Sequence, residues 1–92
     1  MEKNNDLKDI FLLGQIIGDK NRLKIISLLK GQEVNATQIH KTLRLPQNST
    51  SHHLQILLKN EVIKVKRLGR FYYYSLNTPE IKRLASKLKN LF

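Results

Sequence analysis

The chain changes from helical to strand-like sequence once and then returns to helical sequence. Up to Asn60, apolar residues recur at helical spacing, whereas β-branched and aromatic residues dominate from Glu61 to Leu76, on both sides of a break at Leu68-Gly69. After Leu76 the helical spacing resumes. This order predicts a mainly α-helical fold in which four helices are followed by a small β-hairpin and one further helix.

The length of 92 residues leaves room for one hydrophobic core. Domains commonly hold about 100 to 150 residues, so we expect a single domain over residues 1–92. A domain of this size buries only roughly 60 to 65% of the surface that its unfolded chain exposes, and it often gains stability by pairing with a second copy. Self-association is therefore expected.

Capping residues and apolar spacing give the bounds of the five expected helices. These run from Asp6 to Ile17, Lys20 to Lys30, Asn35 to about Leu43, Pro46 to about Asn60, and Thr78 to the end of the chain. The expected N-caps, whose side chains accept bonds from first-turn amides, are Asp19, Asn35 and Thr78. In the second helix we expect Leu23, Ile26 and Leu29 to face the core.

The expected hairpin turns at Leu68-Gly69, with an arginine on either side. This register sets Val65 opposite Tyr72 and Ile63 opposite Tyr74 on one face, and lysines opposite aromatic rings on the other. Leucine disfavours the positive φ of a tight primed turn, so a looser loop is expected at the tip.

The positive charge is unevenly distributed. Residues 1–33 have a net charge of +1, whereas residues 34–92 hold eleven Lys or Arg against two Asp or Glu. Such an excess favours a polyanionic partner, with nucleic acid ahead of an anionic membrane surface.

Several classes of protein are excluded or disfavoured by composition. The chain has no cysteine, which excludes disulfides, thiolate nucleophiles and zinc ribbons and suits a cytoplasmic location. The apolar run IFLLGQIIG is far shorter than the roughly 20 residues that span a bilayer, so we expect neither export nor membrane insertion.

The fourth helix has one polar face that is free of acidic residues. At about 100° per residue, Gln47, Asn48, Ser51, His52, Gln55 and Lys59 share this face, while Thr50, His53, Leu54 and Leu57 lie opposite. Amide, hydroxyl and imidazole groups can donate to and accept from base edges in a major groove. An ordinary solvated face is the alternative, although such faces usually carry Glu and Lys.

The three histidines suggest neither a metal site nor a catalytic one. Because His52 and His53 point apart, they cannot chelate one metal, which would favour a spacing of three or four residues. We expect His53 to be structural, at the edge of the core. No partner for a general base, no catalytic triad and no glycine-rich phosphate loop is legible, so enzymatic activity is not expected. A metal site between subunits that uses His40 stays open.

Three stretches resemble the ArsR (arsenical-resistance-repressor-like) family of small dimeric bacterial transcription regulators. They are DKNRLKIISLL, LPQNSTSHHLQILLKNEVIK and GRFYYYSL, at residues 19–29, 45–64 and 69–76. The resemblance implies a winged helix-turn-helix in which the fourth helix enters the major groove and the hairpin acts as a wing. It also implies that the first and last helices form a twofold homodimer, in agreement with their apolar stripes.

The chain departs from this family where many members bind metals. Many carry two cysteines near the start of the third helix, where this sequence has Asn35 and Thr37. Others place Asp and His ligands on the last helix, where this chain has no histidine and one acid, Glu80. We therefore expect no cofactor and no thiolate-bound metal, and an unknown small-molecule or protein effector stays open.

The sequence thus predicts a dimeric, sequence-specific repressor that binds a double-stranded DNA operator. The residues expected to read bases are Gln47, Asn48, Ser49, Ser51, His52 and Gln55, and those expected on the wing and DNA backbone are Lys64, Lys66, Arg67 and Arg70. The expected dimer residues are Leu7, Ile10, Phe11, Leu84, Leu88 and Leu91. Two other hypotheses are a winged-helix module that docks on protein or RNA, and a wing that binds an anionic surface.

Overall fold

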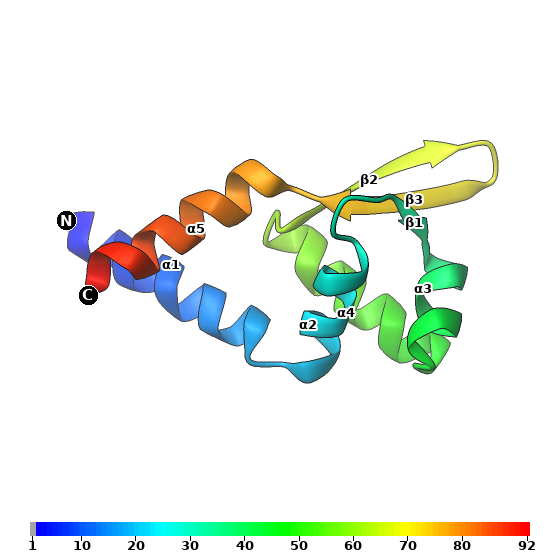
Figure 1. The fold of residues 1–92 in the computed structure, drawn as a ribbon, viewed down its shortest axis with the longest axis horizontal. Coiled ribbons are helices and arrows are strands. Elements are labelled where there is room, and N and C mark those ends of the chain that lie inside the picture. Colours follow the sequence, from blue (N-terminus) through cyan, green and yellow to red (C-terminus); the bar gives the residue numbers. More distant parts are fainter. Residues whose placement is uncertain (1) are drawn as a thin grey trace.

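The computed structural model describes the backbone of residues 2–92 and the surroundings of side chains from residue 6 onward; within that range five helices and three strands follow one another (Figure 1). The helices are α1 (Glu2–Ile17), α2 (Lys20–Leu28), α3 (Ala36–Leu43), α4 (Gln47–Lys59) and α5 (Thr78–Leu91). The strands are β1 (Val34–Asn35), β2 (Ile63–Leu68) and β3 (Phe71–Leu76). The order of helices and hairpin is as predicted, and β1 is an addition.

The junction between α1 and α2 follows the predicted stop and cap. The N–H of Gly18 donates to the carbonyl of Gly14 at 2.8 Å and ends α1. The Asp19 side chain then accepts from the backbone amides of Asn21 and Arg22 at 2.9 and 3.1 Å. These amides lie in the first turn of α2, where they have no acceptor within the helix. The start of α1 lies four residues before the predicted one, and α2 ends two residues early, because tight i→i+3 bonds close its last turn.

The inward face of α2 differs from the prediction. Leu23 is 49% exposed, whereas Ile25 is fully buried and Leu29 almost so. Leu23 is linked to Leu29 through Ile26 by two steps of three residues, and Ile25 is linked to Leu29 by one step of four. Both spacings occur in an apolar stripe, so periodicity alone does not choose between them. Packing of α2 against α1, α3 and α4 selects Ile25.

The two helices of the helix-turn-helix are joined by a tight turn. Asn35 caps α3 as predicted, accepting from the amide of Gln38 at 2.9 Å. Arg44 follows α3 with φ 55°, in the left-handed region, and its N–H closes the end of the helix. Pro46 is the N-cap of α4, and Thr50 donates its hydroxyl to the Pro46 carbonyl at 3.0 Å.

The hairpin has a different register from the one predicted. Val65 pairs with Tyr74 and Leu68 with Phe71, so each pairing is shifted by two residues, and the turn is a tight one made by Gly69 and Arg70. Gly69 takes the positive φ, 63°, at the first turn position, as in a type II′ turn, and Leu68 stays in the strand. The expected looser loop was therefore wrong, but a shift of two keeps every side chain on its expected face.

A third strand, absent from the prediction, completes the sheet. The strand β1 pairs antiparallel with β3, through Val34 with Tyr74 and Asn35 with Tyr73, which gives the order β1-β3-β2. This places the start of α3 directly beside the base of the hairpin. The helix-turn-helix and the wing thus form one unit.

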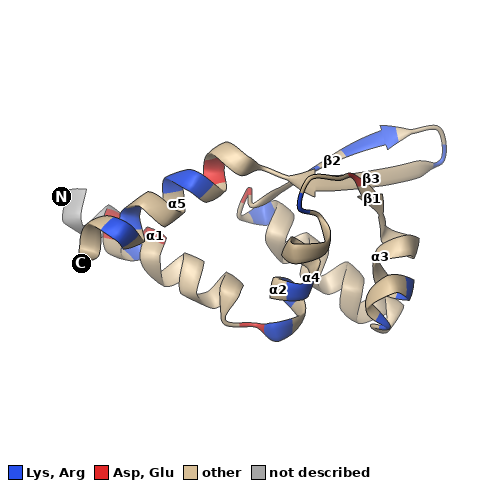
Figure 2. Ribbon diagram, viewed as in Figure 1, with Lys and Arg blue, Asp and Glu red and all other residues tan. Residues whose placement is uncertain are grey.

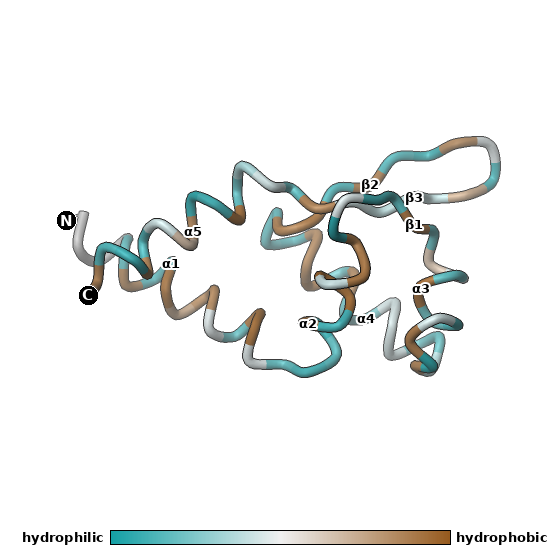
Figure 3. Tube along the Cα trace, viewed as in Figure 1, coloured by the Kyte–Doolittle hydropathy of each residue, from teal (hydrophilic) through white to brown (hydrophobic). Residues whose placement is uncertain are grey.

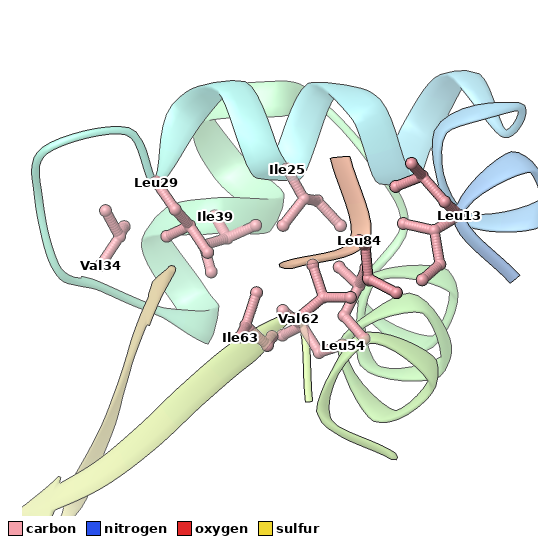
Figure 4. Close-up of a cluster of buried hydrophobic side chains, with 11 residues drawn as sticks. Leu13, Ile25, Leu29, Val34, Ile39, Leu54, Val62, Ile63 and Leu84 are labelled. Atoms are coloured by element: carbon pink, nitrogen blue, oxygen red, sulfur yellow. The ribbon is translucent and has the colours of Figure 1, made fainter. Parts of the chain in front are cut away.

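The core lies where the end of α1, α2, α3, α4, the base of β2 and the middle of α5 meet (Figure 4). Apolar segments of the chain converge there, while the far part of the hairpin extends beyond it (Figure 3). The buried apolar side chains are Leu13, Ile16, Ile25, Leu29, Val34, Ile39, Leu54, Leu57, Val62, Ile63 and Leu84.

The N-cap of the last helix lies one residue before the expected one. Asn77, not Thr78, is the N-cap of α5, because Thr78 is already helical. The side-chain amide of Asn77 does not cap the helix. Its Nδ2 donates to the carbonyl of Glu61 at 2.8 Å, which ties α5 to the turn that follows α4.

The helices α1 and α5 lie side by side and antiparallel, with both chain ends at the same extremity (Figure 1). Two ion pairs join them, from Arg83 to Asp9 at 2.9 Å and from Lys87 to Asp6 at 2.7 Å. In the part of the chain that the structure describes, no helix is long and apolar enough to cross a membrane.

Candidate nucleic-acid interface

The polar face of α4 is exposed, as the helical spacing predicted. Gln47, Asn48, Ser51, His52 and Gln55 are all exposed and together line a shallow groove on the surface. On the opposite side of α4 the buried residues are Thr50, His53, Leu54 and Leu57. Ser49, which we expected to be one of the base-reading residues, is half-buried and does not line the groove.

The first turn of α4 is electropositive. Pro46 gives no side-chain cap bond, and there is no acidic residue in that turn, so free amides and the helix dipole favour a negative partner. No acidic residue occurs anywhere between Glu33 and Glu61. An anionic ligand that approaches this end of α4 therefore meets no repelling carboxylate from the helix-turn-helix itself.

The side chain of Asn48 can donate to a ligand while it keeps a bond to its own helix. Its Oδ1 accepts from the backbone N–H of Ser49 at 2.9 Å. The amide group can therefore donate to a base acceptor, such as N7 or O6 of guanine, without breaking this bond. Gln47 and Gln55 can each present a donor and an acceptor.

The orientation of α4 is fixed by a polar cluster on its buried side. The His53 Nδ1 lies 3.3 Å from Nη1 of Arg22, and its Nε2 lies 4.0 Å from Oδ1 of Asp19. Arg22 also donates to the carbonyl of Gln15 at 2.8 Å. These bonds join α4 to α1 and α2, and His53 is 8% exposed, which confirms its structural position.

The Asp19 carboxylate of this cluster has a pKa below its ordinary value of 3.8. The main cause is the hydrogen bond from the Arg22 amide, with the Asn21 amide and the Arg22 charge acting in the same direction, while partial burial opposes them. The charged form that caps α2 is thus stabilised by the fold.

The four wing cations are all exposed, but they differ in their surroundings. Lys66 forms an ion pair with Glu33 at 3.1 Å, between β2 and the segment before β1. Arg67 donates its Nε to the Gly69 carbonyl at 3.0 Å and lies 5.7 Å from the centre of the Tyr72 ring. Among the residues that the structure describes, neither Lys64 nor Arg70 has an ion-pair partner.

Two further cations border the polar face of α4, and the sequence analysis did not include them. Lys41 lies in the last turn of α3 and Arg44 in the turn before α4, both exposed (Figure 2). The signal for them was their place in the stretch HKTLRLP, between the two helices of a helix-turn-helix. They add two positive charges between the last turn of α3 and the start of α4.

The described residues contain no group of three or more His, Asp or Glu side chains that could hold a metal ion. His40 is half-buried on α3, away from the polar face of α4. The chemistry of the exposed site is therefore hydrogen bonding and charge, offered by a rigid helix and a projecting hairpin.

Residues 19–65 match the family described as "Bacterial regulatory protein, arsR family". This segment runs from the cap of α2 through the first half of β2 and includes the whole helix-turn-helix. Over 62 residues the chain is 48% identical to the transcriptional repressor SdpR of Bacillus subtilis (strain 168), covering 67% of this chain and 69% of SdpR.

Two solved structures extend the similarity to nearly the whole chain. Reduced HlyU from Vibrio cholerae N16961 superposes with a TM-score of 0.81 at 22% identity, covering 99% of this chain and 96% of that one. The homodimeric winged helix-turn-helix DNA-binding domain Mb0332 from Mycobacterium bovis gives a TM-score of 0.77 at 22% identity, covering 97% and 82%. The fold is therefore that of a winged helix-turn-helix.

Proposed function

Because the chain belongs to the arsR family of bacterial regulatory proteins, we propose that it binds a specific double-stranded DNA operator as a homodimer and represses transcription there. The family membership confirms the resemblance drawn from the sequence, and the chain is a DNA-binding transcriptional regulator. Repression is supported by SdpR, whose name states that activity. The observation that carries the proposal is the exposed face of α4, which is rich in hydrogen-bonding groups and free of acids.

In this proposal α4 reads bases and the wing supplies affinity. Gln47, Asn48, Ser51 and His52 lie in the first two turns of α4, the part that reaches base edges in helix-turn-helix proteins. Lys64, Lys66, Arg67 and Arg70 neutralise phosphates, as do the two cations of the α3–α4 turn, Lys41 and Arg44. The electropositive start of α4 adds to this attraction.

The homodimer uses α1 and α5. Leu7, Phe11 and Leu91 are 55%, 68% and 51% exposed, so a large apolar surface lies uncovered at this end of the chain. Ile10 and Leu88, on the same two helices, are half-buried and belong to the proposed interface. Leu84 is fully buried in the core of the single chain, so we leave it out of the proposed interface. The homodimeric state named for Mb0332 supports a homodimer of this chain.

Regulation by a metal is not part of the proposal. The positions at which many family members carry ligands hold Asn35 and Thr37, and α5 contributes one acid, Glu80. The carboxylate of Glu80 is bonded to Arg83 at 2.8 Å, which lowers the pKa of Glu80 and engages it in the fold. Neither catalysis nor a cofactor is proposed.

The experiment is a selection of duplexes from random DNA, followed by retardation assays with the selected duplex and a scrambled one across salt. The expected result is tighter binding of the selected duplex, with specific affinity roughly 10³-fold or more above the scrambled one. Both affinities should fall as salt rises, since counterions are released from phosphates. Equal affinity for the two duplexes, together with tighter binding of RNA or of a protein, would refute operator binding and favour the docking hypothesis.

A further inference from the structure

The outer half of the wing carries an apolar pair that nothing in the single chain covers. Leu68 and Phe71 are paired across the last rung of the hairpin, and they are 55% and 48% exposed. At the base of the same hairpin, Ile63 is 2% exposed and belongs to the core. The hairpin therefore projects away from the core (Figures 1 and 3), and the pair next to its turn consists of two large apolar residues.

The two side chains share one face of the sheet. Directly opposed residues of an antiparallel pair point to the same side, so Leu68 and Phe71 form one apolar unit, and Lys66 with Tyr73 follows on that face. On the opposite face the last pair is a cation and an aromatic ring, because the Arg67 guanidinium lies over the Tyr72 ring. Tyr72 on that face is itself 51% exposed, but its ring faces a cation, whereas Leu68 and Phe71 form a purely apolar pair.

The tip is held in a defined conformation. Gly69 allows the tight turn, and the side chain of Arg67, in β2, donates to the carbonyl of Gly69. An apolar pair on such a rigid turn loses little conformational entropy when it is inserted into a partner.

The charge of the hairpin defines the kind of partner. Between Ile63 and Leu76 there are four cations and no acid, so the apolar pair must meet a polyanion that also offers an apolar interior. Duplex DNA does so, because its stacked bases lie behind the phosphates. An anionic bilayer fits less well, because Arg70 is exposed at the turn itself, so that the leading end of the hairpin carries a charge.

We propose that Leu68 and Phe71 form a wedge that enters a base step of the DNA minor groove beside the site read by α4, unstacks it and bends the duplex. Minor-groove proteins insert Phe or Leu in this way, with kinks of about 20–90°. Steps such as TA and CA/TG deform most easily, so the wedge gives sequence preference at bases that α4 does not touch. This inference rests on the proposed operator binding.

The test uses a duplex selected by the wild-type protein from random DNA, with 2-aminopurine placed at successive positions outside the bases protected by α4. The wild type should raise the fluorescence at one step in each half-site. Phe71→Ala and Leu68→Ala should abolish the rise and weaken binding about five- to 150-fold, the range for losing a base-stacking side chain. The salt slope should stay unchanged in both, since no phosphate contact is lost.

Arg70→Ala is the matched control on the same turn. It should keep the fluorescence rise but reduce the salt slope by about 0.9, as expected for one lost phosphate contact. Circular dichroism melting of all three variants should match the wild type, because their side chains bury little in the chain.

The outcomes separate this proposal from the proposed function. Intact operator binding with no fluorescence change at any step would refute the wedge alone, and failure to bind any duplex would refute both. Binding of phosphatidylglycerol vesicles that is lost in Phe71→Ala, with DNA binding unchanged in that variant, would assign the pair to a membrane surface and overturn the wedge.

Discussion

Gln47 and Arg70 represent, as single residues, the two kinds of contact that a DNA-binding surface makes. Gln47 is an exposed neutral amide on the first turn of a rigid helix, and Arg70 is an exposed cation on a hairpin turn. Base edges distinguish sequences, whereas phosphates are the same in every sequence. Gln47 should therefore affect sequence preference, and Arg70 should affect the affinity for any duplex.

Gln47→Ala should relax the preference for one base at a single position of the operator. It should lower the binding free energy by about 1–3 kcal/mol on the cognate duplex only. Arg70→Ala should weaken cognate and scrambled duplexes alike, because it removes only charge. Titrations of both variants with both duplexes at several salt concentrations measure this. If Gln47→Ala weakened both duplexes equally while Arg70→Ala changed the preferred sequence, the assigned roles would be reversed.

Asp19 connects a single carboxylate to the stability of the fold. Asp19→Ala removes the cap of α2 and should cost about 1 kcal/mol, a fall in melting temperature of roughly 4–8 °C. Asp19→Asn keeps a capping oxygen and should cost less. Thermal unfolding followed by circular dichroism, at one protein concentration because of the dimer, compares the three chains.

The same carboxylate should make stability dependent on pH. Because its folded pKa is depressed, Asp19 contributes stability above its ordinary value of 3.8, and this contribution is lost as pH falls through the lower folded pKa. Asp19→Asn should lack this part of the acid transition. An identical decline of both proteins below about pH 4 would contradict the linkage.

Among the structural elements, the short strand β1 links the wing to the helix-turn-helix. It pairs with β3 and is followed directly by α3, and the preceding residue, Glu33, forms the ion pair with Lys66 of β2. The wing is thereby anchored at its base while its tip projects freely. One cation of the wing is also partly neutralised in the unbound protein.

Glu33→Gln should release Lys66 and strengthen DNA binding. Exposed ion pairs contribute only about 0–1 kcal/mol, so affinity should rise by at most about fivefold, equally for cognate and scrambled duplexes. The salt slope should increase by up to about 0.9 as Lys66 gains a phosphate. Glu61→Gln is the control, since it removes the same charge from an exposed turn where no ion pair is present among the described side chains. An equal gain in both variants would mean that net charge alone, not Lys66, is responsible.

In the whole molecule, the proposed surfaces for self-association and for DNA lie at opposite ends. The chain measures 44 × 24 × 19 Å, with α1 and α5 at one end and the wing, α3 and the start of α4 towards the other (Figure 1). A twofold axis near α1 and α5 would therefore place two copies of α4 far apart. This is the arrangement that palindromic half-sites require.

Phe11→Glu should weaken the dimer. Phe11 is 68% exposed, so its replacement by a charge should leave the single chain folded but oppose burial between two chains. Sedimentation velocity should show a shift towards monomer at low micromolar concentration, and operator affinity should fall in parallel. Leu23→Glu is the control, because Leu23 is also an exposed apolar residue, at 49%, but lies on α2. A dimer that survives Phe11→Glu, or that dissociates with Leu23→Glu, would move the interface away from α1.

The sequence alone determined the order of the helices and the hairpin, and the two faces of α4. Asp19 and Asn35 cap their helices because a side-chain oxygen at that position satisfies free amides, a local interaction that needs no tertiary partner. The polar and buried sides of α4 followed from helical geometry alone. The family stretches gave the winged helix-turn-helix by resemblance, and both the family and the fold are confirmed.

Tertiary structure decided between arrangements that the local sequence patterns allow equally well. The hairpin register moved by two residues, a shift that preserves every alternation of faces, so only Gly69 in its turn and the pairing with β1 distinguish the two registers. The strand β1 has two residues, too few for a periodic signal. Leu84 and Phe11 both belong to apolar stripes, yet one is fully buried and the other exposed, because a stripe shows which side of a helix is apolar but not which neighbour covers it.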